Sequence, residues 1–327
     1  MTPTDTLRLP AGGTLCWGVD LALGAWAGAS VLLALGLAGL TRWWWQLGAL
    51  AILGGVGRWG VRRPLRPLIA AALGGVVFLP VALGPPFFYD AFVYHLGLPW
   101  QAMLEGGWHG HPENLFSTFP PLAQLLYLPL LSVDLLRAPA MLHWLAWLTA
   151  ASSVHALARR SGAPSLAAGL AAAAAAAAPA SVLVAGFPAA EAWLLVGLLP
   201  ALVLATGARR RSSCALAGLL AGMATAARLQ GLPWSLLIVG ILGLRYRKRV
   251  REIPIFFGCW LAGSLPWWGK NLVLLGDPTA PLFWQREGME TLWRDSQAML
   301  KGGAALAEIV AALPQLLAPQ LPWLLPL

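Results

Sequence analysis

The side chains best suited to chemistry gather in one interval of the sequence, residues 87–127. This interval holds carboxylates and imidazoles, the groups that most often move protons or bind cations: Asp90, Glu105, Glu113, His95, His109 and His111. The rest of the chain up to residue 275 is largely apolar, with short arginine-rich or Gly/Pro interruptions. Because ionisable groups are costly in apolar surroundings, their concentration predicts that the chemistry takes place in this interval.

The composition indicates a helical membrane protein. Hydrophobic residues make up 58% of the 327 residues and charged residues only 11%, which is too little charge for the surface of a soluble domain of this size. The apolar runs are continuous, whereas the strands of a membrane barrel alternate apolar and polar residues. The net charge of +9 comes from arginine clusters beside apolar segments, a pattern that reports membrane topology rather than nucleic-acid binding.

The cysteines indicate neither a disulfide framework nor a zinc site. Cys16, Cys214 and Cys259 lie in or beside apolar segments and lack metal-ligand spacing. The N-terminal segment has no basic n-region of the kind found in signal peptides. We therefore expect the first apolar segment to be retained as a membrane anchor.

Apolar segments near the length of a membrane span predict about ten transmembrane helices in an all-α polytopic protein. The predicted spans are residues 19–40, 43–56, 68–83, 138–158, 165–184, 189–206, 213–227, 232–244, 253–268 and 304–325. They form a single transmembrane domain over residues 1–327. Its parts are N-terminal helices at 19–84, an outer catalytic loop with amphipathic interfacial helices at 85–137, a helical bundle at 138–270, an outer loop at 271–303 and a C-terminal apolar segment at 304–327.

Four arginine-rich clusters fix the predicted orientation of these helices. They lie at residues 58–66, 159–160, 209–211 and 245–251, and by the positive-inside rule all four face the cytoplasm. One path through the segments satisfies all four clusters, provided that residues 120–136 do not span the membrane. We therefore predict that 120–136 form a helix that lies in the outer interface or re-enters it.

This topology brings charged residues from separate parts of the chain to the outer face. Asp90, His95, Glu191, Arg228 and Lys270 all fall in outer loops or at the outer ends of predicted helices. Two acids, a histidine and two cations are the groups that a site needs in order to remove a proton and hold a phosphate.

Several stretches resemble the GT-C superfamily of membrane glycosyltransferases, in particular the bacterial relatives of protein O-mannosyltransferases and aminoarabinose transferases. YDAFVYHLGLP resembles the family's first-outer-loop pattern, and FPPLAQLLYLPLL is similar to the amphipathic segment that follows it. AGFPAAEAWLLV and ARLQGL resemble patterns with an acid after a short outer turn and with Lys or Arg near an outer helix end. LPWWGKNLVLLGDPTAPLFW resembles the "PW..(K/R)N....GNP.YP" stretch, so the resemblance covers residues 68–284.

The resemblance implies an inverting glycosyltransferase of the bacterial inner membrane whose site faces the periplasm or exterior. The donor would be a polyprenyl-phosphate-linked sugar, and the acceptor a hydroxyl group of a glycan, lipid or protein. Asp90 would be the general base, Glu191 would position the acceptor, the sugar or a metal, and His95 would touch the donor phosphate or orient Asp90. The implied substrate-binding residues are Tyr94, Trp100, Arg228, Lys270 and Asn271, and the two cations among them would neutralise the departing phosphate.

Five of these residues also have a purely structural interpretation. Asp90 could cap a helix, Glu191 could complement a helix dipole, and His95 could serve only as a hydrogen-bonding residue at the interface. Arg228 and Lys270 could extend their charges to lipid head groups.

Metal and sugar contacts are further open alternatives in the outer loop. His109, His111 and Glu113 could bind a divalent cation or remain solvated on a flexible loop. Most of the 18 tryptophans are expected to lie in an interfacial belt, with Trp100 and Trp108 as the candidates for a sugar platform.

Two other classes of protein remain open from the sequence. A transporter or flippase of a lipid-linked or small solute typically has midplane acids, broken helices and inverted repeats. Prolines occur inside the predicted spans, but the sequence has no midplane acid and no convincing repeat. A non-catalytic scaffold with the same fold is the other class, and the presence of Asp90, Arg228 and Lys270 argues mildly against it.

Overall fold

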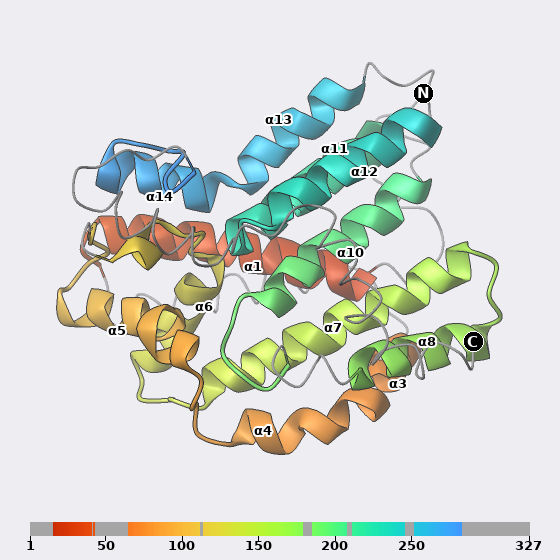
Figure 1. Cartoon of the computed structure of the whole chain (residues 1–327), viewed down its shortest axis with the longest axis horizontal. Helices are drawn as coiled ribbons and strands as arrows, with labels where there is room; N and C mark the ends of the chain where they lie inside the picture. Colours follow the sequence, from red (N-terminus) through yellow and green to blue (C-terminus); the bar gives the residue numbers. More distant parts are fainter. Residues whose placement is uncertain are drawn as a thin grey trace, which may run out of the picture.

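The computed structural model describes residues 16–40, 42, 65–111, 114–178, 185–207, 211–245 and 252–282, and within these ranges every regular element is a helix. In chain order the elements are α1 (Cys16–Leu37), α3 (Arg66–Gly75), η2 (Val76–Phe78), α4 (Leu79–Leu83), η3 (Ala91–His95), α5 (Gly97–Leu104), η4 (Leu115–Thr118), α6 (Leu122–Leu131), α7 (Ala138–Arg160), α8 (Ser165–Ala177), α10 (Glu191–Gly207), α11 (Arg211–Ala227), α12 (Gly231–Arg245), α13 (Ile253–Gly263) and α14 (Leu265–Leu275). The predicted all-α class is thus confirmed for the described residues (Figure 1).

Two described helices are long and apolar enough to cross a membrane by length and composition. They are Gly18–Leu37, and Arg66–Leu83, which combines α3, η2 and α4. Other apolar helices, such as Glu191–Gly207 and Ile253–Gly263, have 10–17 residues. The predicted spans at 43–56 and 304–325 lie outside the described residues.

The helix predicted at residues 253–268 is in fact two helices, α13 and α14, with a break at Ser264. Pro266 in the first turn of α14 lacks the N–H group that an uninterrupted helix would use there. The hydroxyl group of Ser264 donates to the Trp260 carbonyl at 2.9 Å. The apolar pattern continues across this break, which is why hydrophobicity alone missed it.

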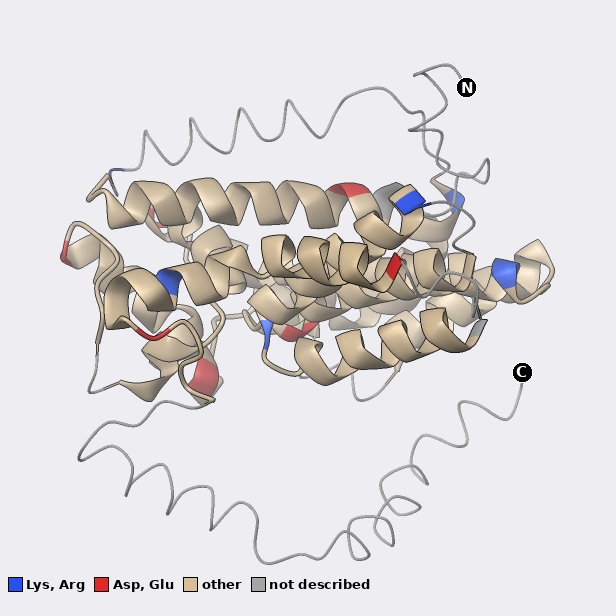
Figure 2. Cartoon of the chain, turned by 90° about the horizontal axis from the view of Figure 1, so that it is seen from above, with Lys and Arg blue, Asp and Glu red and all other residues tan. Residues whose placement is uncertain are grey.

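From α7 to α13 successive helices alternate in direction (Figure 1), so their ends collect at two opposite sides of the molecule. At one side Arg160 donates to the Val203 carbonyl, and the Cys214 thiol lies 3.1 Å from the carboxylate of Glu252. These residues adjoin three of the predicted cytoplasmic clusters. Basic positions mark the far right of the described helices in Figure 2, and other basic positions lie toward the left, where most of the acidic positions are. The short helices α5 and α6 and helix α14 lie at the left in Figure 1.

Helix α6 occupies the interior at this left end. All of its residues except Leu130 are buried, and it packs against α1, α5 and α7. Its ten residues reach only about 15 Å, half of a hydrocarbon core of roughly 30 Å. The expectation that this segment does not span agrees with its length. Apolar side chains on every side of α6 are covered by protein.

Close backbone packing holds α11 against α13. A Cβ atom placed on Gly263 would overlap the Leu219 carbonyl oxygen, whereas one placed on Gly258 would meet nothing within 4 Å. Small residues at helix crossings allow backbones to approach in this way, and they do so where packing rather than water drives association. Helix packing therefore requires a glycine at Gly263 of α13 but not at Gly258.

Replacing Gly263 with alanine is expected to lower the free energy of unfolding by about 1–3 kcal/mol, because the new methyl group must push α13 away from α11. The matched control is Gly258→Ala on the same helix, which is expected to be neutral or to stabilise by up to ~1 kcal/mol. Unfolding of both variants in detergent is followed by circular dichroism. Equal stability of the two variants would contradict the close crossing.

Candidate functional site

The first predicted site residues lie on η3, a single π-helical turn. The Leu96 N–H group donates to the Ala91 carbonyl at 2.8 Å, five residues earlier. Gly97 follows, and a Cβ atom there would overlap the carbonyl oxygen of Phe92. Such turns are rare and occur frequently at functional sites. The turn leaves Tyr94 and His95 buried next to one another.

Asp90 and Tyr94 form a hydrogen-bonded pair on this turn. The Tyr94 hydroxyl donates to Asp90 Oδ2 at 3.0 Å, and the Tyr94 ring stacks on Phe116 with centroids 4.6 Å apart. Burial raises the pKa of the Tyr94 phenol, and the negative charge and hydrogen bond of Asp90 raise it further. The phenol therefore stays protonated and holds one carboxylate oxygen of the half-buried Asp90.

His95 is almost fully buried beside this pair. Its side chain is 2% exposed, and its Nδ1 atom has no hydrogen-bond partner among the described residues. Burial lowers the pKa of His95 well below 6.5, and the nearby His143 and Arg228 lower it further. The imidazole is therefore neutral at pH 7, and it offers a hydrogen bond rather than a charge.

Glu191 and Arg228 form an ion pair across the ends of α10 and α11. Glu191 is the first residue of α10, and its Oε2 atom accepts from the Ala190 N–H group at 3.0 Å. The Nε atom of Arg228 donates to the side chain of Gln230 at 2.9 Å. Two residues 37 positions apart in the sequence, Glu191 and Arg228, are thus fixed at the same end of the bundle.

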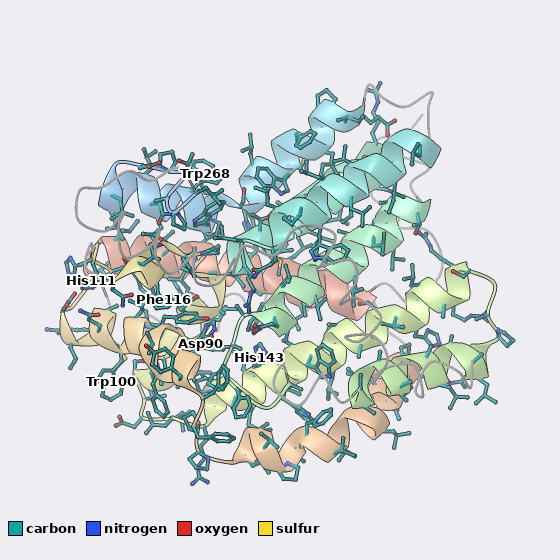
Figure 3. The ribbon with its side chains drawn as sticks, viewed as in Figure 1. Asp90, Trp100, His111, Phe116, His143 and Trp268 are labelled. Atoms are coloured by element: carbon teal, nitrogen blue, oxygen red, sulfur yellow. The ribbon has the colours of Figure 1, made fainter. Side chains whose placement is uncertain are left out.

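A cavity of about 310 Å³ lies between these groups, within the size range of small-molecule sites. Its lining residues are Tyr94, His95, Phe119, Pro120, Gln124, Ala190, Ala227, Arg228, Leu229 and Gln230. Asp90 and Glu191 are not among the lining residues. Asp90 contacts the lining residue Tyr94, and Glu191 contacts the lining residue Arg228. The cavity thus combines apolar walls with one cation, a neutral imidazole, a phenol and two amides. Figure 3 shows the side chains of this region, including Asp90 and His143.

A buried polar network around Tyr127 supports the α10 side of the cavity. The Tyr127 hydroxyl donates to the Ala189 carbonyl at 2.7 Å, accepts from Trp193 Nε1 at 3.2 Å and contacts His143 Nδ1 at 3.0 Å. A phenol has a single proton to donate, and the indole N–H can only donate. Since the hydroxyl proton goes to the Ala189 carbonyl, Tyr127 must accept from His143. The proton of that hydrogen bond therefore lies on His143 Nδ1. The network thus fixes Ala189, which lies two positions before Glu191.

Lys270 and Asn271 do not line the cavity. Lys270 is 1% exposed, and its ammonium group donates to the Ser117 carbonyl. The Asn271 amide nitrogen donates to the carbonyls of Thr118 at 2.8 Å and Ala280 at 2.7 Å. Both predicted substrate-binding residues therefore hold the segment that leads into the cavity wall at Phe119.

The remaining predicted residues lie elsewhere in the outer loop. Trp100 is 40% exposed and lies at the edge of the molecule in Figure 3. His111 pairs with Glu105 at 3.3 Å, while His109 is exposed. Within the described ranges no three His, Cys, Asp or Glu side chains gather around a possible metal position. Glu113, the third predicted metal ligand, is outside those ranges.

Several residues of this region were not identified from the sequence. Gln124 and Gln230 line the cavity, while Tyr127, His143 and Trp193 make the buried network. Gln230 could have been found, because it follows Arg228 by two positions in ARLQGL. The network had no comparable signal, since its members are 16 and 66 positions from Tyr127.

Comparison with protein-family models, with curated proteins and with solved structures found no match to this chain. The resemblance to GT-C glycosyltransferases therefore rests on the quoted sequence stretches alone.

Replacing Tyr127 with phenylalanine is expected to lower the free energy of unfolding by at least about 2 kcal/mol, because the Ala189 carbonyl and two ring N–H groups lose a buried partner. Tyr89→Phe is the matched control, since the Tyr89 side chain is 70% exposed and should tolerate the change. Thermal unfolding in detergent measures both. A Tyr127→Phe variant as stable as the control would contradict the network.

Proposed function

We propose that this chain is a polytopic glycosyltransferase of the bacterial inner membrane with a GT-C-like bundle of about ten transmembrane helices. It transfers a sugar from a polyprenyl-phosphate-linked donor to a hydroxyl group of a glycan, lipid or protein acceptor at the outer face. The observation that supports this best is the cavity in which Tyr94, His95 and Arg228 meet, with two carboxylates directly behind them.

In the proposed reaction the acceptor oxygen attacks the anomeric carbon of the donor sugar. The bond from that carbon to the phosphate oxygen breaks, and the acceptor proton passes to Asp90. A single displacement of this kind inverts the anomeric configuration. The charge that develops on the departing phosphate is stabilised by Arg228, whose guanidinium fork suits phosphate oxygens.

The groups around Asp90 are suited to these roles. Tyr94 donates to one carboxylate oxygen, which keeps the carboxylate oriented while the other oxygen receives the proton. Neutral His95 can bind a sugar hydroxyl or a phosphate oxygen through the Nδ1 edge of its ring. Lys270 acts indirectly in this proposal, by holding the segment before Phe119. A divalent cation at Glu191, which the sequence left open, would have to displace Arg228.

The membrane placement is supported by the two apolar helices and by the separation of the helix ends. Helix α7 has 23 residues and is therefore roughly 35 Å long, enough to join the two faces of a bilayer. Its start adjoins the outer loop, and its end carries Arg159 and Arg160. The proposed cavity then opens at the outer face, where lipid-linked donors present their head groups.

Asp90→Asn is expected to lower sugar transfer by about 10²–10⁴-fold, because the amide cannot take the acceptor proton. Purified protein in liposomes receives radiolabelled polyprenyl-phosphate mannose, glucose or aminoarabinose in turn, with a cell-envelope extract as acceptor. The released polyprenyl phosphate and the labelled product are measured.

The matched control is Asp134→Asn. Asp134 is an exposed acid with a positive φ of 60°, a conformation that asparagine tolerates well, so transfer should not change. Both variants must be recovered folded to the same yield. Wild-type rates in Asp90→Asn would remove this residue from the mechanism, and absence of transfer from every donor in the wild type would contradict the proposed activity.

Cysteine labelling tests the membrane placement. In a variant without the native cysteines, a membrane-impermeant maleimide applied to whole cells is expected to label Leu135→Cys but not Ser161→Cys. Both positions are exposed and flank α7. Permeabilising the membrane should make Ser161→Cys reactive toward the maleimide. Equal labelling of the two positions in intact cells would contradict a transmembrane α7.

A further inference from the structure

The carboxylate of Glu191 occupies a position suited to an anionic ligand. Glu191 begins α10, a helix of 17 residues, and accepts from the Ala190 N–H group. Unpaired N–H groups at a helix start attract anions, and Arg228 adds a positive charge at the same point. The two side chains are each 31% exposed, so the pair is accessible rather than sealed in the core.

A separate observation indicates that the adjoining cavity takes a polar ligand. His95 lines the cavity while only 2% exposed, and its Nδ1 atom lacks a partner within the described chain. Buried polar atoms in folded proteins are seldom left without a hydrogen bond. A ligand that reaches His95 also reaches Arg228 and Gln230, since all three line the same cavity.

We propose that Glu191 is an internal substitute for the phosphate group of the ligand, and that a phosphate-bearing ligand takes Arg228 from Glu191 when it binds. This inference rests on the proposed function, because it concerns the same cavity. It makes Glu191 a specificity-determining residue rather than one that holds the acceptor. A ligand must offer a phosphate and also fill the apolar walls in order to compete with a carboxylate that is always present.

The geometry explains why the two anions exclude one another. Gln230 engages Nε of Arg228, and Glu191 engages one terminal nitrogen. Because Nε is already engaged, a phosphate that binds the guanidinium with two oxygens uses both terminal nitrogens, including the one that Glu191 holds. A carboxylate left in place would then face a second negative charge at close range, which is unfavourable. When the phosphate product leaves, Glu191 can return to Arg228.

Glu191→Gln tests the proposal, because glutamine keeps the size of glutamate and one accepting oxygen but removes its charge. Binding of farnesyl phosphate and of inorganic phosphate to the full-length protein in detergent is measured by calorimetry, with farnesol as the uncharged probe. We expect Glu191→Gln to bind farnesyl phosphate about three- to tenfold more tightly than the wild type. Arg228→Gln should bind it at least tenfold more weakly.

The double variant shows whether the two residues act on one anion. If Glu191 competes for Arg228, the gain from Glu191→Gln disappears when Arg228 is also replaced by glutamine, so the two effects are not additive. Equal thermal stability of Glu191→Gln and the wild type shows that the gain is not a consequence of altered folding. A gain that persists without Arg228 would overturn the proposal.

The remaining outcomes separate this inference from the proposed function. Unchanged or weaker binding in Glu191→Gln, with loss in Arg228→Gln, overturns the role of Glu191 but leaves the phosphate site intact. Absence of phosphate binding in all variants overturns both. A gain for farnesyl phosphate alone identifies a lipid-borne phosphate as the ligand, and an equal gain for inorganic phosphate identifies a free anion; either supports the exchange at Arg228.

Discussion

The hydrogen bonds of the Tyr127 hydroxyl group are the interactions on which the candidate site depends. It joins α6 to α7 through His143 and to the start of α10 through Ala189 and Trp193. In an apolar interior a polar group without partners is expensive, so a network in which the hydroxyl proton and both acceptor positions are used favours one arrangement over others.

The consequences of that arrangement can be followed from residue to residue. Fixing Ala189 fixes the first turn of α10, which orients Glu191, and Glu191 in turn holds Arg228 at the end of α11. The opposite wall of the cavity is fixed in the same manner, since Lys270 and Asn271 bind the carbonyls of η4 just before Phe119. Two sets of buried polar contacts thus frame the cavity, and the outer loop lines it with Tyr94 and His95 of η3 and with Phe119, Pro120 and Gln124.

Much of the fold follows from the sequence, because the length of apolar runs and the positions of arginine clusters are local signals. The bounds of α7 and α11 lie within two residues of the predicted ones, and the alternation of clusters places Asp90, His95, Glu191 and Arg228 at one end. The π turn and the break at Ser264 depend on single backbone contacts that periodicity does not report. The burial of Lys270 could not be predicted either, since a lysine at a helix end looks the same in sequence whether it faces a ligand or a backbone carbonyl 153 positions away.

The position of Lys270 changes the charge balance expected at the cavity. With Lys270 engaged by a carbonyl, Arg228 is the one cation among the described lining residues, and the carboxylate of Glu191 already neutralises it. An unpaired guanidinium next to apolar walls would be costly, and the ion pair with Glu191 offsets that cost. In the proposed exchange the phosphate takes the place of the carboxylate at Arg228 and adds contacts with the walls. The same pair therefore neutralises Arg228 beside the apolar walls and, in the proposed exchange, weakens the binding of any anion that lacks an apolar part.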